Sequence, residues 1–281
     1  MALTYTNPII DILTVEHTEP QWLIPDFLLQ GSLVALAGEP GTGKSVLSYT
    51  LGLAIASGYE TLSGIVPAGE PRRVLYFDQE NGHQDRDKYL LQCWHGLKNP
   101  DVALLHEHFF PVHFALGQDE WPDVVAEYVD LLQPHVTIFD TTTPCFNIEE
   151  ENSNGEATRA TNRLRELARQ TDPVMTILVI KHAKMLMKKG GRRTMRGGKA
   201  WEGAVDGTMY QVRAPGRPRN NGLSLTRLEP AKTRAYGLRR TIYITPEWTD
   251  TAMTGLVLSG SYMPNSAHSK AERDEDRELE D

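Results

Sequence analysis

The chain has 281 residues, 40% of them hydrophobic, which favours one α/β domain with additions over two full domains. Its net charge of −8 hides an asymmetry, because residues 181–240 hold 16 Lys and Arg against three acids, a net of +13. Such a basic third within an acidic protein indicates a localised surface for a polyanion. The distant Cys93 and Cys145 argue against a disulfide framework and a zinc site. With no leader pattern and no membrane-length apolar run, we expect a cytoplasmic protein without membrane contact.

The chain begins with an apolar lead-in over residues 1–30, which we expect to pack on the first strand of the core through Trp22–Pro25 and Phe27–Leu29. The core is expected over residues 31–262. An acidic tail, residues 263–281, follows and is expected to be disordered, since seven acids and three bases crowd its last twelve positions.

A phosphate-binding loop opens the core. Residues 38–45 satisfy G-x-x-x-x-G-K-[ST] between a strand expected at 32–37 and a helix expected at 46–54. The glycines let backbone N–H groups surround a phosphate, and the helix N-terminus adds partial positive charge. Lys44 can reach the outer phosphates and Ser45 can hold Mg²⁺. We therefore predict ATP and Mg²⁺ as ligands, bound at Gly38, Glu39, Pro40, Gly41, Thr42, Gly43, Lys44, Ser45 and Val46.

Acids follow two further apolar strands. Asp140 ends the strand expected at 136–140 and is predicted to bind the metal. In many AAA+ ATPases a catalytic glutamate comes next, but Thr141 stands there, so the base must lie elsewhere. Glu80, after the strand expected at 74–78, can orient an attacking water, with Asp78 as the weaker rival. Helices are expected at 86–95, 119–132 and 155–170, and a short strand at 109–114.

The strand expected at 175–180 runs into His182, which can sense the γ-phosphate by hydrogen bonding. A glycine-rich basic segment follows and indicates a mobile loop that contacts nucleic-acid phosphates with little base preference. Its predicted DNA contacts are Lys188, Lys189, Arg192, Arg193, Arg196 and Lys199.

Later strands are expected around residues 208–212, 223–228 and 241–244. With the earlier alternation they predict an α/β fold, a mostly parallel twisted sheet with helices on both faces and antiparallel strands at the C-terminal edge. Lys232 and Arg234 alternate to one side of a strand. If these two cations contact the γ-phosphate bound to a neighbouring subunit, hydrolysis requires the subunits to assemble into a ring or a filament.

This order of motifs resembles the RecA-like P-loop ATPases, and within them the RepA-like hexameric replicative DNA helicases. The most specific similarity is Phe139-Asp140-Thr141 followed by the acidic run 146–152 and Gly155, with Leu23–Pro25 and His182–Lys184 also similar. The resemblance covers roughly residues 20–240.

The resemblance implies a homo-oligomer, a hexameric ring that hydrolyses ATP between subunits and moves along single-stranded DNA. It assigns ATP and Mg²⁺ binding to Lys44, Ser45 and Asp140, the base to Glu80, the phosphate sensor to His182 and cross-subunit fingers to Lys232 and Arg234. DNA would pass residues 145–154 and 185–198.

Two other functions stay open at this point. A phage-type RecA-like recombination or strand-annealing ATPase would use the same core to pair strands rather than separate them. A regulatory or assembly ATPase would switch a protein partner, which the acidic tail could dock. If the protein is a helicase, the same tail could bind a replication or recombination protein.

Overall fold

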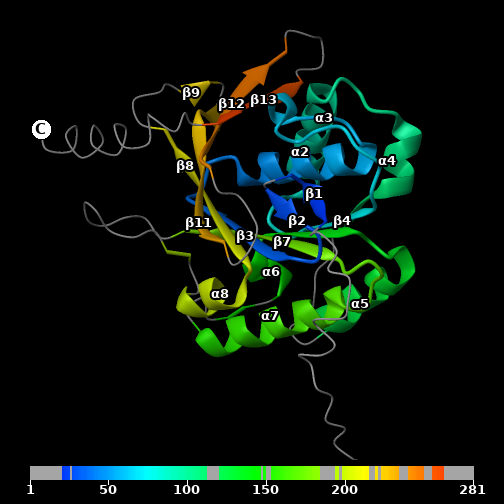
Figure 1. Ribbon diagram of the computed structural model, residues 1–281, viewed down its shortest axis with the longest axis vertical. Helices are drawn as coiled ribbons and strands as arrows, with labels where there is room; N and C mark the ends of the chain where they lie inside the picture. The colour runs from blue at the N-terminus through cyan, green and yellow to red at the C-terminus, as the bar shows by residue number, and fades with distance from the viewer. Residues whose placement is uncertain are drawn as a thin grey trace, which may run out of the picture.

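The structure is a computed structural model that describes residues 21–25, 27–112, 120–146, 148–149, 153–183, 194–195, 198–214, 219–220, 223–233, 240–249 and 255–262. Its centre is a nine-stranded sheet in the order β13-β12-β11-β8-β3-β7-β6-β4-β5 (Figure 1). The strands are β3 (Leu33–Gly38), β4 (Val74–Asp78), β5 (Phe109–Val112), β6 (Val136–Asp140), β7 (Thr176–His182), β8 (Gly207–Arg213), β11 (Thr226–Thr233), β12 (Ile242–Trp248) and β13 (Leu256–Tyr262).

The sheet has a parallel half and an antiparallel edge. The strands from β8 through β3, β7, β6 and β4 to β5 pair in parallel, whereas β8, β11, β12 and β13 pair antiparallel. This confirms the predicted fold class. Because β7 and β6 lie between β3 and β4, the strand that follows the phosphate loop in the sequence is not its neighbour in the sheet.

Helices cover both faces of the parallel strands. In Figure 1, α2, α3 and α4 lie on one side, and α5, α7 and α8 lie on the other. Two buried hydrophobic clusters, one on each face, fill the layers between helices and sheet. The helices are α2 (Lys44–Ser57), α3 (His83–Gly96), α4 (Val102–His108), α5 (Trp121–Leu132), α6 (Thr142–Cys145), α7 (Asn154–Ala168) and α8 (Gly198–Ala204), with a 3₁₀ turn, η1 (Leu62–Gly64).

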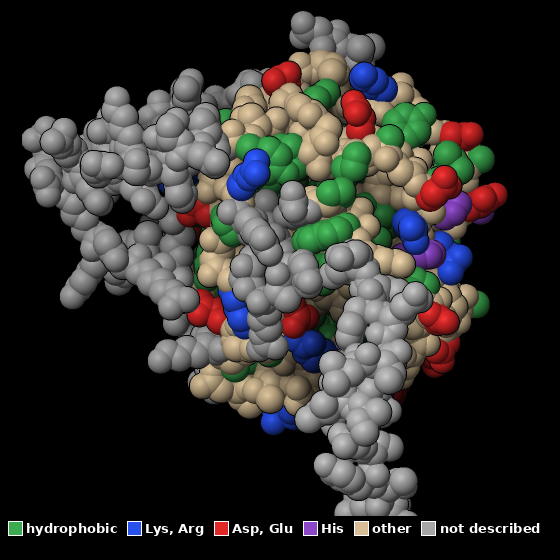
Figure 2. All heavy atoms as spheres, viewed as in Figure 1, with side chains coloured by type: hydrophobic (Ala, Val, Ile, Leu, Met, Phe, Trp, Pro, Cys, Tyr) green, Lys and Arg blue, Asp and Glu red, His purple; other side chains and the backbone are tan. Residues whose placement is uncertain are grey.

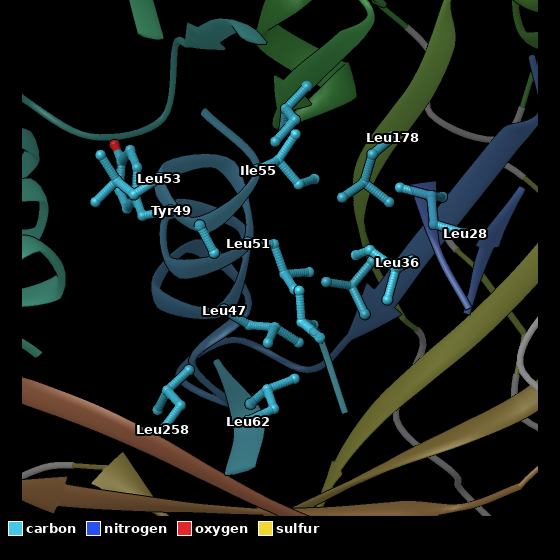
Figure 3. Packing of buried hydrophobic residues seen from close by; sticks show 14 of the residues in the cluster. Leu28, Leu36, Leu47, Tyr49, Leu51, Leu53, Ile55, Leu62, Leu178 and Leu258 are labelled. Carbon is cyan, nitrogen blue, oxygen red and sulfur yellow. The ribbon is translucent and has the colours of Figure 1, made fainter. Parts of the chain in front are cut away.

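The helix that follows the phosphate loop is buried almost throughout. Figure 3 shows Leu47 and Leu51 of α2 directed toward Leu36 of β3, with Leu178 of β7 beside them. A helix that is apolar all round belongs inside a domain, where both of its sides are covered. Here the second cover comes from α3 and from the antiparallel edge, whose Leu258 joins the same cluster. This packing fixes the N-terminus of α2 at the end of β3.

The lead-in contributes a short hairpin. β1 (Trp22–Ile24) pairs antiparallel with β2 (Leu28–Leu29), and Ile24 and Leu28 are buried in the cluster around α2. A second small hairpin joins β9 (Arg219–Asn220) to β10 (Leu223–Ser224). Residues 1–20 and the tail at 263–281 lie outside the described residues. Within the described part of the chain, no helix combines the length and apolarity needed to cross a membrane.

Candidate nucleotide site

The phosphate loop joins the end of β3 to the start of α2. Gly41 and Gly43 have φ angles of 71° and 87°, a left-handed conformation that favours glycine. A Cβ on Gly38 would lie 2.5 Å from the backbone oxygen of Gln211. Lys44 is only 6% exposed, and its Nζ donates to the carbonyl of Glu39 at 3.0 Å. The loop thus has the compact backbone and the inward lysine that a phosphate requires.

Two side chains of strand β8 donate hydrogen bonds to backbone carbonyls of the phosphate loop. Gln211 Nε2 donates to the carbonyl of Thr42 at 3.0 Å, and the exposed Arg213 donates to the carbonyls of Pro40 and Gly41 at 3.1 and 3.4 Å. The sequence analysis missed both residues. Nothing in the local sequence marks them, because their role depends on β8 pairing beside β3.

Glu80 and His182 meet across the site. His182 pairs in register with Gly38, and its Nε2 lies 3.5 Å from Oε1 of Glu80. This contact is the main influence that lowers the pKa of Glu80, and Lys44 acts in the same direction. The Nδ1 of His182 is buried and has no hydrogen-bond partner in the part of the chain that the structure describes. The structure therefore brings the predicted base and the predicted sensor together, although their roles stay predictions.

Both carboxylate oxygens of Asp78, the rival base, already accept hydrogen bonds from the protein. Its side chain is fully buried and accepts the backbone N–H groups of Glu80 and Asn81 at 3.2 and 3.0 Å. The hydroxyl of Tyr49, from α2, donates to its other oxygen. A carboxylate held in this way shapes the turn that carries Glu80, and the role of Glu80 as the base stays a prediction.

Asp140 is fully buried at the end of β6. Burial raises its pKa to about 7, to which the charges of Asp78 and Glu80 contribute, while the hydroxyls of Ser45 and Tyr76 oppose the shift. Tyr76 donates to Oδ2 at 3.0 Å, whereas Oδ1 has no hydrogen-bond partner among the described residues. An unpartnered buried carboxylate oxygen beside a hydroxyl suits a cation.

The described residues contain no group of three or more His, Cys, Asp or Glu side chains that could hold a metal. Mg²⁺ does not need one, because it is commonly bound through one or two carboxylates, water and the phosphates of a substrate. Ser45 and Asp140 therefore fit Mg²⁺ that arrives with a nucleotide.

Lys181, which the sequence analysis did not select, lies next to His182 but is buried in the other layer. Its Nζ donates to Thr142 Oγ1 at 2.9 Å and lies 4.2 Å from the ring centroid of Trp201 in α8. Trp201 also stacks on Phe146, just after α6. These contacts connect the ends of β6 and β7 to α8.

The predicted finger and DNA residues are only partly described. Lys232 donates through Nζ to the backbone carbonyls of Glu202, Gly203 and Val205, at the end of α8 in its own chain. Its finger role stays a prediction. On the face shown in Figure 2, basic and acidic side chains of described residues are interspersed. Outside the described residues lie Arg234, Lys188, Lys189, Arg192, Arg193 and Arg196, and also the side chain of Lys199.

A family model described as an AAA domain matches residues 5–186. The matched segment includes the phosphate loop, Glu80, Asp140 and His182, and it ends before Lys232. No curated protein matches the chain.

Proposed function

The chain belongs to the AAA domain family and is a P-loop ATPase, and on that premise we propose that it is an ATP-dependent DNA helicase or translocase of the RepA type. One observation carries the proposal. The ends of three parallel strands, β4, β6 and β7, bring Glu80, Asp140 and His182 to the phosphate loop at the end of β3. The net charge of +13 over residues 181–240 supports DNA as the second ligand.

The chain's own residues divide the chemistry of hydrolysis. The backbone N–H groups of the loop and Lys44 bind the phosphates. Ser45 and Asp140 would hold Mg²⁺, which neutralises the charge that develops on the phosphates. Glu80 orients the attacking water and accepts its proton, and its lowered pKa keeps it ionised for that task. His182 holds Glu80 in place and is close enough to the loop to respond to the γ-phosphate.

The neighbouring subunit would complete the site. In a ring, Arg234 would reach the γ-phosphate bound to the next subunit and stabilise the charge of the transition state, an effect of about 10³–10⁵ in rate for arginine fingers. The basic segment at 188–199 would face single-stranded DNA. ATP turnover and DNA binding would then depend on each other, as a motor requires.

The test is the ATPase rate with and without single-stranded DNA, measured for the wild type and for Arg234→Ala. We expect DNA to stimulate the wild type, and Arg234→Ala subunits to inhibit wild-type subunits in mixed rings out of proportion to their number. A strand-displacement assay should show unwinding. ATP turnover that is indifferent to DNA, together with no displacement, would refute the proposal.

Two measurements separate the alternatives. Electron microscopy with ATP and single strands distinguishes closed six-fold rings from the filaments or open rings of an annealing or recombination protein. Substitution of Lys188, Lys189 or Arg192 should flatten the salt dependence of DNA binding by about one unit of slope each. An unchanged slope would favour a regulatory ATPase with a protein partner.

A further inference from the structure

Two tyrosines lie behind the site, between α2 and the sheet. The ring of Tyr49, on α2, stacks on the ring of Tyr76, on β4, with centroids 4.6 Å apart. Their hydroxyls serve different acids, since Tyr49 donates to Asp78 and Tyr76 donates to Asp140. Both rings are fully buried. Buried hydroxyls need hydrogen-bond partners, and because both partners here are acids of the site, the two contacts are candidates for functional positioning.

The direction of the hydrogen bonds around Tyr76 follows from its partners. The ionised carboxylate that a metal requires only accepts, so the single proton of Tyr76 then goes to Oδ2 of Asp140, at 3.0 Å. Ser48 Oγ lies 2.6 Å from the phenol oxygen, and its single proton is shared between that oxygen and the Ser45 carbonyl. Ser48 lies one turn after Ser45 on α2, and its hydroxyl is also 2.9 Å from the Ser45 carbonyl. A chain of hydroxyls thus connects the first turn of α2 to the end of β6.

We propose that Tyr76 is a positioning residue for magnesium: by occupying Oδ2 of Asp140, it leaves Oδ1 directed to the metal beside Ser45. The inference rests on the proposed ATPase site, because the metal would arrive with the nucleotide. It deepens that site by naming the group outside the ligand set that orients the carboxylate. Outer groups of this kind typically change metal affinity by about 10–100-fold when they are removed.

The hydrogen bond between Tyr76 and Asp140 is buried, so water cannot easily substitute for it. Asp140 and Tyr76 are both 0% exposed, so no water can replace the phenol without rearrangement. Without the hydroxyl, the carboxylate could turn Oδ2 toward Ser45 or settle between positions. The loss would appear in the binding of the metal–nucleotide complex, and nucleotide binding through Lys44 and the loop backbone would be spared.

The experiment measures the dissociation constant of a fluorescent ATP analogue with Mg²⁺ and with EDTA, for the wild type, Tyr76→Phe and Tyr49→Phe. Both variants keep the stacked rings and lose one hydroxyl, so Tyr49→Phe is a matched control. We expect Tyr76→Phe to reduce the gain in affinity from Mg²⁺ about tenfold, with binding in EDTA unchanged. Tyr49→Phe should retain the gain.

Ser48→Ala provides a second variant that keeps the phenol and removes only the hydroxyl beside it, and we expect a smaller loss in the same direction. Thermal unfolding is the control that tests whether each variant folds. An unchanged magnesium gain in Tyr76→Phe, or equal losses in Tyr76→Phe and Tyr49→Phe, would overturn the inference. A wild type whose nucleotide affinity ignores Mg²⁺ would instead overturn the proposed function.

Discussion

The buried carboxyl of Asp140 should make the metal-free protein less stable as the pH rises. Its pKa is about 7 in the folded protein against an ordinary value of 3.8. The folded state therefore binds more protons than the unfolded state between pH 4 and pH 7, and stability falls as the pH rises through that window. A difference of about three pH units corresponds to about 4 kcal/mol at neutral pH. Asp140→Asn, of the same shape and always neutral, should be free of this penalty.

The assay is urea unfolding of both proteins in EDTA from pH 4 to pH 7.5. As the pH rises, the free energy of unfolding of the wild type should fall relative to that of Asp140→Asn. Subtracting one curve from the other removes the contribution of every group that titrates in both proteins. Mg²⁺ with a nucleotide should stabilise the wild type at pH 7 more than Asp140→Asn, because in the wild type the metal also takes the place of the proton, whereas the variant gains only from nucleotide binding. Parallel curves across the range would refute the account of Asp140.

Three further predictions concern the reacting groups and the edge of the sheet. Glu80→Gln should reduce phosphate release by about 10²–10⁴-fold while fluorescent-nucleotide binding is retained; a smaller loss would move the base elsewhere. His182→Ala removes the main influence that lowers the pKa of Glu80, so the acid limb of the pH–rate profile should move to higher pH, and an unmoved limb would contradict the pairing. Gly96→Ala should lower the melting temperature, because a Cβ there would meet the backbone oxygen of Leu256, whereas Gly82→Ala, with open space around it, is the matched control.

Local signals predicted the parallel core well. The strands at 74–78 and 136–140 have the expected bounds, because each is a short apolar run that ends in an acid. The phosphate loop was equally readable, since its binding groups are consecutive. By contrast, β13 and α4 were missed. The glycine and serines of Leu256–Tyr262 make a weak strand signal, and this edge strand is held by pairing with β12 and by packing on α3.

The contacts that orient the site residues could not be predicted from local sequence either, because they join residues that are far apart in the chain. Tyr76 is an ordinary apolar-strand residue in the sequence, and its bond to Asp140 spans 64 positions. Asp78 and Glu80 could be ranked, but only the structure shows that Asp78 is occupied by the turn and by Tyr49. Sequence patterns thus indicated the groups that we predict to touch a ligand, and the structure adds the side chains that contact those groups.

Lys232 and Arg234 were predicted as one pair, and the structure gives reason to test them separately. The last carbonyls of a helix have no partner within it, and a cation there satisfies them and complements the helix dipole. Lys232 does this for α8 through the carbonyls of Glu202 and Gly203, and it also donates to Val205, just after the helix, at 2.8 Å. Lys232→Gln should therefore lower the melting temperature of the isolated chain. If Lys232 is also a finger, its variant subunits will inhibit mixed rings as Arg234→Ala subunits should. A loss of stability without that inhibition would leave Arg234 as the cation that acts across the interface.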